Sequence, residues 1–108
     1  MSKYFKEIEE NMNVDFLALL DEARELAGIP FKITSAYRTK EHNAKIGGVA
    51  NSSHIKGLAV DISINSSRRR FIVLNALISV GFNRIGIAET FIHVDNDKDK
   101  SKNVIWTY

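Results

Sequence analysis

Apolar residues in the first quarter of the chain recur at intervals of three and four positions. This spacing predicts an amphipathic α-helix over residues 14–27, because such intervals place side chains on one face. Asn13 stands at the position of an N-cap, and Gly28 and Pro30 follow in the order that usually ends a helix. A shorter helix is expected before it, within residues 4–11. The apolar stripe expected on the main helix is Phe16, Leu19, Leu20, Ala23 and Leu26.

Two later segments also have helical spacing. A short helix is expected over residues 40–46, with Thr39 as its N-cap. Ser66 or Ser67 would cap a longer helix that runs to about residue 80. The apolar stripe expected on that helix is Phe71, Leu74, Leu77 and Ile78.

The clearest strand pattern lies between residues 58 and 64. Apolar and small or polar residues alternate there, which is typical of a β-strand with one buried face. Further strands are expected over 31–35, 84–88, 91–94 and 104–108, with loops over 49–56 and 96–103. Because helices come mostly first and strands mostly last, we expect an α+β fold: one domain over 1–108, with helices packed on one face of a small antiparallel sheet.

Composition and charge narrow the class of protein. Hydrophobic residues make up 44% of the chain and charged residues 26%, as in ordinary globular domains. No apolar run approaches the ~20 residues of a membrane span, so we expect no membrane-spanning helix. The 15 basic and 13 acidic residues give a net charge of +2. A nucleic-acid module, suggested by the basic cluster Arg68–Arg70, is therefore the weakest functional alternative, and we expect no nucleic-acid partner.

The candidate chemistry lies in two histidines and one aspartate. The chain has no cysteine, so a bound metal must be held by His, Asp or Glu. Asp61 lies between Val60 and Ile62, so its side chain points to the face of the strand opposite to theirs. A carboxylate in an otherwise apolar strand needs a polar partner. With His54 in the preceding loop and His93 in a later strand, Asp61 forms a ligand set suited to catalytic zinc. The alternative is that these residues are structural. His93 would then be a hydrogen-bonded, half-buried histidine, and Asp61 would cap a turn or form an ion pair with a surface lysine.

Several ordered blocks of the sequence resemble one family of enzymes. The segments 33–39, 41–43 and 47–54 resemble zinc peptidases that cleave peptidoglycan stem peptides. These are the D-alanyl-D-alanine carboxypeptidases and L-alanyl-D-glutamate endopeptidases, which share a hedgehog-like α+β fold. The strand 91–95 resembles the one that carries their third metal ligand, and the likeness runs from about residue 14 onward. The family's Ser-x-His-x-x-Gly-x-Ala-x-Asp signature matches at Ser52, His54, Gly57, Ala59 and Asp61.

The resemblance implies roles for particular residues. It places Zn²⁺ on His54, Asp61 and His93, with a zinc-activated water as the nucleophile. Arg38 would stabilise the oxyanion, for which a guanidinium is suited by its fixed charge and its fork of donors. The alternative for Arg38 is a structural ion pair with a carboxylate. Ser53 and Tyr37 would line the substrate groove. The expected substrate is a peptidoglycan stem or cross-link peptide, cut next to a D-amino acid.

The general base departs from the family pattern. Members of the family place Glu or Asp three residues before the last histidine ligand, and this chain has Thr90 there. Glu89 could act as the general base from the turn that carries it, and we favour it over Asp95. Asp95 could serve instead; otherwise it orients a ligand histidine. Because Thr90 cannot accept the proton, the alternative function is a protein that binds zinc and wall peptide without cleaving.

Localisation is expected from the same resemblance. The first residues have no secretory signal, whereas the peptidoglycan lies outside the membrane. Resemblance to the wall-lytic enzymes of bacteriophages implies a protein that stays cytoplasmic until lysis releases it, or that a virion carries; the alternative is a bacterial housekeeping enzyme. We expect a monomer. Both the D-Ala-D-Ala and the L-Ala-D-Glu bond are candidates for cleavage.

Overall fold

The two long helices begin and end where their local signals place them. The computed structural model describes residues 1–108. Helix α1 spans Val14–Ala27, its Asn13 side chain accepts a hydrogen bond from the Phe16 amide at 2.8 Å, and Gly28 ends it with a φ of 70°. Helix α3 spans Ser67–Ser79, and Ser66 is its cap. Both helices predicted from apolar spacing are confirmed.

Of the short helical elements, one forms as predicted and two are 3₁₀ helices. The N-terminal segment forms only a 3₁₀ turn, η1, over Lys6–Ile8. Helix α2 spans Lys40–Lys45 and has the predicted cap, Thr39, whose hydroxyl accepts a hydrogen bond from the His42 amide at 3.1 Å. Within the loop expected over 49–56, the chain forms a second 3₁₀ helix, η2, over Ser53–Lys56.

Five strands form one sheet in the order β1-β2-β4-β3-β5. They are β1 (Ile33–Ser35), β2 (Ala59–Ser63), β3 (Arg84–Ile87), β4 (Phe91–Asp95) and β5 (Val104–Thr107). The α+β class is confirmed, but β5 pairs with β3 in parallel and the other pairs are antiparallel. The sheet is therefore mostly antiparallel, as expected, and its one parallel pair is β3 with β5. Since β2 and β3 already occupy both edges of β4, the returning β5 pairs with the outer edge of β3, where its direction is parallel.

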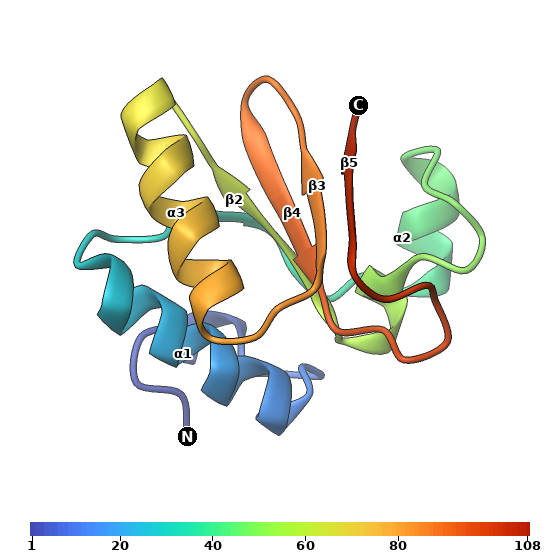
Figure 1. Cartoon of the computed structure of the whole chain (residues 1–108). Helices are drawn as coiled ribbons and strands as arrows, with labels where there is room; N and C mark the ends of the chain where they lie inside the picture. Colours follow the sequence, from blue (N-terminus) through green and yellow to red (C-terminus); the bar gives the residue numbers. More distant parts are fainter.

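The hydrophobic core lies between one face of this sheet and the helices α1 and α3 (Figure 1). The figure shows these helices at the left of the strands and α2 at the right. The sheet contributes inward residues of its central strands. They are Val60, Ile62, Ile85, Ile92 and Val94, each at most 1% exposed.

The predicted stripe of α3 is corrected by the structure. Phe71 is 70% exposed and Ile78 is 48% exposed, whereas Val73, Ala76 and Leu77 are buried. Apolar side chains lie on several sides of this helix, so spacing alone does not select the face that packs. On α1 the stripe is nearly right, with Leu26 exposed and Leu17 buried in addition. None of the helices combines the length and apolar character that a membrane span requires.

Candidate metal centre

The face of the sheet opposite α1 and α3 carries a row of functional side chains. Strand pairing sets Asp61 on β2 opposite His93 on β4, His93 opposite Gly86 on β3, and Gly86 opposite Trp106 on β5. Because side chains alternate along each strand, these positions share one face. The predicted grouping of Asp61 and His93 on the open face of the sheet agrees with this register.

His54 reaches the same row from the 3₁₀ helix η2, which leads into β2. The Ser52 hydroxyl accepts a hydrogen bond from the His54 amide at 3.2 Å and begins the helix. Gly57 ends it with a φ of 70°. A Cβ at Gly57 would lie 2.2 Å from the carbonyl oxygen of Asn11, so only glycine allows this close approach of the N-terminal segment. His54 is consequently fixed and 3% exposed.

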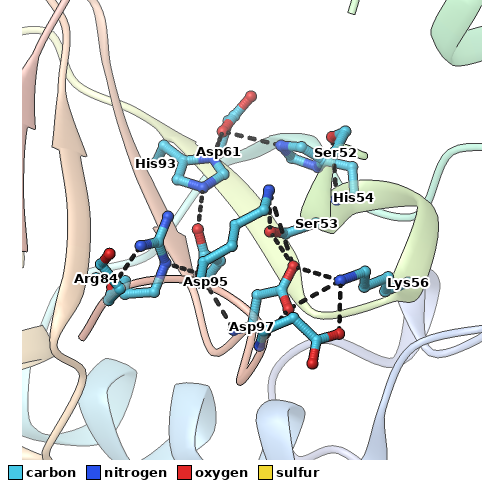
Figure 2. Close-up of polar contacts among 12 residues, drawn as sticks. Ser52, Ser53, His54, Lys56, Asp61, Arg84, His93, Asp95 and Asp97 are labelled. Atoms are coloured by element: carbon cyan, nitrogen blue, oxygen red, sulfur yellow. Dashed lines mark hydrogen bonds and ion pairs between the residues drawn. The ribbon is translucent and has the colours of Figure 1, made fainter. Parts of the chain in front are cut away.

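The three predicted ligands converge. Ligand atoms of His54, Asp61 and His93 all lie within 4.8 Å of one another. Nε2 of His54 is 3.3 Å from Oδ1 of Asp61, and Nδ1 of His93 is 3.0 Å from the same oxygen. Figure 2 shows both imidazoles turned toward the Asp61 carboxylate. Two nitrogens and one carboxylate oxygen facing one point are the donor set of a catalytic zinc site.

Each imidazole is also held by its other nitrogen. Nδ1 of His54 lies 2.8 Å from the carbonyl oxygen of Ala36, which can only accept a hydrogen bond. Nε2 of His93 lies 2.7 Å from Oδ2 of Asp95. The carbonyl oxygen of Ala36 assigns the N–H of His54 to Nδ1 and leaves a lone pair on Nε2; a metal ion on Nδ1 of His93 would leave the N–H of that ring on Nε2, toward Asp95. The residues present therefore fit a divalent metal ion.

An open cavity of about 340 Å³ lies over this centre. Its wall includes both histidines, both carboxylates and the ring of Trp106. That ring lies 5.6 Å from the His93 ring and packs directly on Gly86, where a Cβ would be 2.5 Å from the indole nitrogen. The cavity is large enough for part of an extended peptide.

A comparison with models of known protein families shows which family the chain belongs to. The model of the Peptidase M15 family matches residues 2–95. The chain belongs to this family. Peptidases of the M15 family are zinc-dependent, and the His54–Asp61–His93 group of this M15 peptidase could bind such an ion. No curated protein matches the chain.

Electrostatics of the M15 site favour a cation between these groups. Burial opposes the charge of Asp61, but hydrogen bonds with His54 and His93 outweigh it and hold the pKa of Asp61 well below its usual value. Burial likewise opposes protonation of His93, yet Asp61 and Asp95 raise the pKa of His93. Positive charge is thus stabilised at the point where the ligand atoms meet.

Arg38, the predicted oxyanion residue, lines the cavity and is held by two neighbours. Its Nε donates to the Ser35 hydroxyl at 3.1 Å, and its Nη1 donates to Oδ1 of Asn43 at 3.1 Å. Asn43 is 2% exposed and donates in turn to the carbonyl oxygen of Val49 at 2.7 Å. Nη2 is 3.8 Å from Oδ2 of Asp61. The guanidinium therefore lies at the edge of the metal centre in a fixed orientation.

The remaining predicted residues are placed differently from one another. Ser53 lines the cavity, whereas Tyr37 does not. Asp95 also lines it, but Arg84 and the Asp97 amide donate to its Oδ1 at 2.7 and 3.1 Å, and its Oδ2 contacts His93. Glu89 is exposed in the β3–β4 hairpin, outside the lining of the cavity. The structure thus brings Asp95 to the centre but leaves Glu89 away from it.

Sequence reasoning gives no role to several cavity residues of this M15 peptidase. Arg84 alternates with Gly86 on β3, a pattern that could have placed it beside His93 on the open face. Asn43 belongs to a block used for the resemblance, but its contact with Arg38 depends on the turn after α2. Lys100 lies in a charged loop with no periodicity. No local signal could have found it.

Proposed function

We propose that this M15 peptidase hydrolyses peptidoglycan stem or cross-link peptides next to a D-amino acid, with Zn²⁺ as its cofactor. The observation that carries the proposal is the convergence of Nε2 of His54, Nδ1 of His93 and Oδ1 of Asp61, with the outer nitrogen of each imidazole held by an acceptor. Membership in the peptidase M15 family supports the reaction class. The preference for wall peptides rests on the resemblance of the sequence motifs.

His54, Asp61 and His93 would hold the ion. Zinc bound there would act as a Lewis acid on the scissile carbonyl. It would also lower the pKa of a water molecule bound to it, so that this water becomes a nucleophile at neutral pH. The cavity above these ligands accommodates the peptide, and the ring of Trp106 gives it an apolar wall. Ser53 contributes to the wall next to His54.

Arg38 is proposed to stabilise the negative charge that develops on the carbonyl oxygen. Ser35 and Asn43 anchor Nε and Nη1 of its guanidinium, and the Arg38 side chain is 16% exposed. An anchored cation in a recessed site needs little reorganisation when charge develops, which makes its contribution large. Nη2 of Arg38 is 3.8 Å from Oδ2 of Asp61, too far for a hydrogen bond, so this nitrogen is available to donate to a substrate oxygen in the cavity.

We propose that Asp95 positions His93 rather than accepting a proton itself. Both its oxygens are engaged, one by His93 and one by Arg84 and the Asp97 amide. A carboxylate in this place fixes the ring orientation of a ligand histidine and raises its basicity. Glu89 could act as the base only if the hairpin that carries it moved toward the cavity.

This arrangement also favours a second candidate function. The carboxylates that line the cavity are Asp61 and Asp95 alone, and neither is a free acceptor for a proton from water. The second candidate is a family member that binds zinc and wall peptide without cleaving the peptide.

Metal analysis followed by digestion separates these candidates. The purified protein is loaded with zinc, assayed for bound metal and incubated with purified peptidoglycan, and released peptides are identified by mass. His93→Ala is compared with His42→Ala, because His42 is exposed on α2 and does not line the cavity. We expect one zinc per chain and peptide release from the wild type and His42→Ala, and neither from His93→Ala. Zinc without release supports the second candidate, and a folded wild type without zinc contradicts both.

The biological setting is proposed from the resemblance to bacteriophage lytic enzymes. We propose a role in wall degradation during phage lysis or entry, as an endolysin or a virion component. The digestion experiment also names the bond, because D-Ala-D-Ala cleavage releases a single D-alanine and L-Ala-D-Glu cleavage releases a longer peptide.

A further inference from the structure

Three cationic side chains line the cavity: Arg38, Arg84 and Lys100. Two of them are committed to protein partners. Arg38 is anchored by Ser35 and Asn43 and lies beside Asp61. Arg84 donates through Nε to Asp95 at 2.7 Å and through Nη1 to the Ser101 carbonyl oxygen, and its guanidinium stacks 5.0 Å from the Trp106 ring centre. The charge of Arg84 is therefore balanced by Asp95, and Arg38 already has a proposed role at the developing oxyanion.

The ammonium of Lys100 is different because its nearest carboxylate, Asp97, is hydrogen-bonded to another lysine, Lys56, which also contacts the exposed Asp99. Nζ of Lys100 is 3.8 Å from Oδ2 of Asp97, beyond hydrogen-bond distance. Asp97 accepts hydrogen bonds from Nζ of Lys56 on both oxygens at 3.0 Å and from the Ser53 hydroxyl at 2.8 Å. Lys100 donates only to the Ser53 hydroxyl, at 3.0 Å. An ammonium has three donors, so two stay available on a residue that lines the cavity.

The position of this ammonium is fixed by a buried cluster. Asp97 is 2% exposed and joins the β4–β5 loop to Ser53 and Lys56 of η2 (Figure 2). Ser53 directly precedes His54, so its hydroxyl sets Lys100 within about one residue of a proposed metal ligand. The Lys100 side chain is 22% exposed, which recesses its charge and weakens screening by salt. A recessed, oriented cation with spare donors is a binding site for an anion.

We propose that Lys100 binds the free α-carboxylate of the substrate residue whose nitrogen leaves when the peptide bond is cut. This inference rests on the proposed function. The α-carboxylate of that residue is separated from the scissile nitrogen by a single carbon, so it is the substrate charge that must come close to the metal centre. Lys100 makes this contact from the β4–β5 loop, whereas Arg38 comes from the segment after β1. The proposal makes Lys100 a specificity residue that selects a leaving residue with a free acid.

A pair of peptides tests this role. The peptide spans the bond that the peptidoglycan digest identifies, and it is made with the α-carboxylate of the leaving residue either free or amidated. We expect wild-type kcat/KM to be roughly 10- to 100-fold higher for the free acid, as for a hydrogen bond to a charged group. In Lys100→Met this ratio falls to about one, because activity on the free acid falls far more than activity on the amide.

Lys98→Met is the matched control, because Lys98 is exposed on the same loop and does not line the cavity. It removes the same charge and should keep the wild-type ratio. Bound zinc should be equal in the three proteins. Equal loss on both peptides in Lys100→Met would overturn the proposal, as would a wild type that cleaves both peptides alike. A natural leaving residue without a free α-carboxylate would overturn it as well.

If the wild type binds zinc but releases no peptide, the failure belongs to the proposed hydrolysis. Calorimetry of the zinc-loaded protein with D-alanyl-D-alanine peptides, as free acid and as amide, then tests Lys100 directly. We expect the free acid to bind roughly 10-fold or more tightly than the amide in wild type and Lys98→Met, but not in Lys100→Met. Equal binding of both peptides by the wild type would overturn the inference.

Discussion

The two faces of the sheet differ in what holds them together. On β2, Val60 and Ile62 point toward α1 and α3 and are fully buried. Asp61, between them, points to the opposite face and meets His54 and His93. The first face is stabilised by removing apolar area from water, which is not directional. The second depends on directed contacts between a few polar groups.

This difference teaches how a small fold can carry a metal centre. The same strands supply both faces, so the packed face fixes the backbone positions of the proposed ligands Asp61 and His93 on the other face. Each proposed ligand histidine has a second polar partner, Ala36 for His54 and Asp95 for His93. Substitutions on one face should therefore change stability, and substitutions on the other should change metal binding.

The largest effects should come from two neighbouring residues of β2. Ile62→Ala removes a fully buried side chain and should lower the free energy of unfolding by about 2–5 kcal/mol. Asp61→Asn should reduce peptidase activity on the order of 10³-fold and abolish stoichiometric zinc binding, because it removes an anionic ligand. Urea denaturation measures the first effect, and metal analysis with peptide release measures the second.

The separation between these two variants is the informative result. Ile62→Ala should still bind one zinc per folded chain, and Asp61→Asn should keep a native circular dichroism spectrum. If Ile62→Ala lost zinc while it remained folded, or if Asp61→Asn bound zinc as the wild type does, the division between the two faces would be wrong.

The features that the sequence predicts correctly are those that depend on residues close together along the chain. Asn13 and Gly28 mark the ends of α1 because capping needs only neighbouring residues. Alternation places Asp61 and His93 on the open face because side chains on a strand have a period of two. For the metal site, these local rules and the signature around His54 are sufficient to select three side chains that converge.

The features that sequence does not predict depend on distant contacts. Apolar spacing assigns Phe71 wrongly to the packing face of α3, because only the position of the sheet decides which apolar side is covered. The parallel pairing of β5 follows from which edges β2 and β3 already occupy. Lys100 belongs to a loop whose position is set by Asp97 and η2.

Gly86→Ala should disturb the polar face without touching a ligand. A Cβ at this position would lie 2.5 to 2.9 Å from atoms of the Trp106 indole, so the ring must move. We expect a loss of about 1–3 kcal/mol in the free energy of unfolding and a changed emission spectrum, since Trp106 is the single tryptophan. Fluorescence of the folded protein reports the movement.

Gly28→Ala is the control for this experiment. Gly28 has a left-handed backbone, with a φ of 70°, and a Cβ added there would meet no atom within 4 Å. The variant should therefore lose about 1 kcal/mol from backbone strain and keep an unchanged spectrum. Identical spectra for Gly86→Ala and the wild type would show that the indole does not rest on Gly86.

Asp95→Asn should weaken the metal centre by a smaller amount. Loss of the carboxylate that holds Nε2 of His93 is expected to reduce zinc affinity 10- to 100-fold, or about 1.4–2.7 kcal/mol. Competition with a chelator measures this affinity. Glu89→Gln is the comparison, because Glu89 is exposed outside the cavity. If Glu89→Gln lost turnover while Asp95→Asn kept both turnover and zinc, our assignment of these two acids would be reversed.

The smallest effect concerns pH and the cluster around Asp97. Burial opposes its charge, but hydrogen bonds from Lys56 and Ser53 prevail and lower the pKa of Asp97. A lowered pKa gives stability that is present above the ordinary aspartate pKa of about 4 and is lost as pH falls through the folded value. Asp97→Asn should therefore be less stable than the wild type at pH 7, on the order of 1 kcal/mol. The difference should shrink in urea titrations as pH falls below the ordinary aspartate pKa and through the lower pKa of the folded protein; a constant difference would contradict the role of its charge.

The most direct test of the metal centre is a crystal structure of the zinc-soaked protein with anomalous diffraction at the zinc edge. We predict one strong peak, bonded to Nε2 of His54, Nδ1 of His93 and the Asp61 carboxylate at about 2.0–2.2 Å. The outer imidazole nitrogens should keep their contacts with Ala36 and Asp95. A zinc ion bonded through Nε2 of His93, or no peak at these three residues, would contradict the assignment.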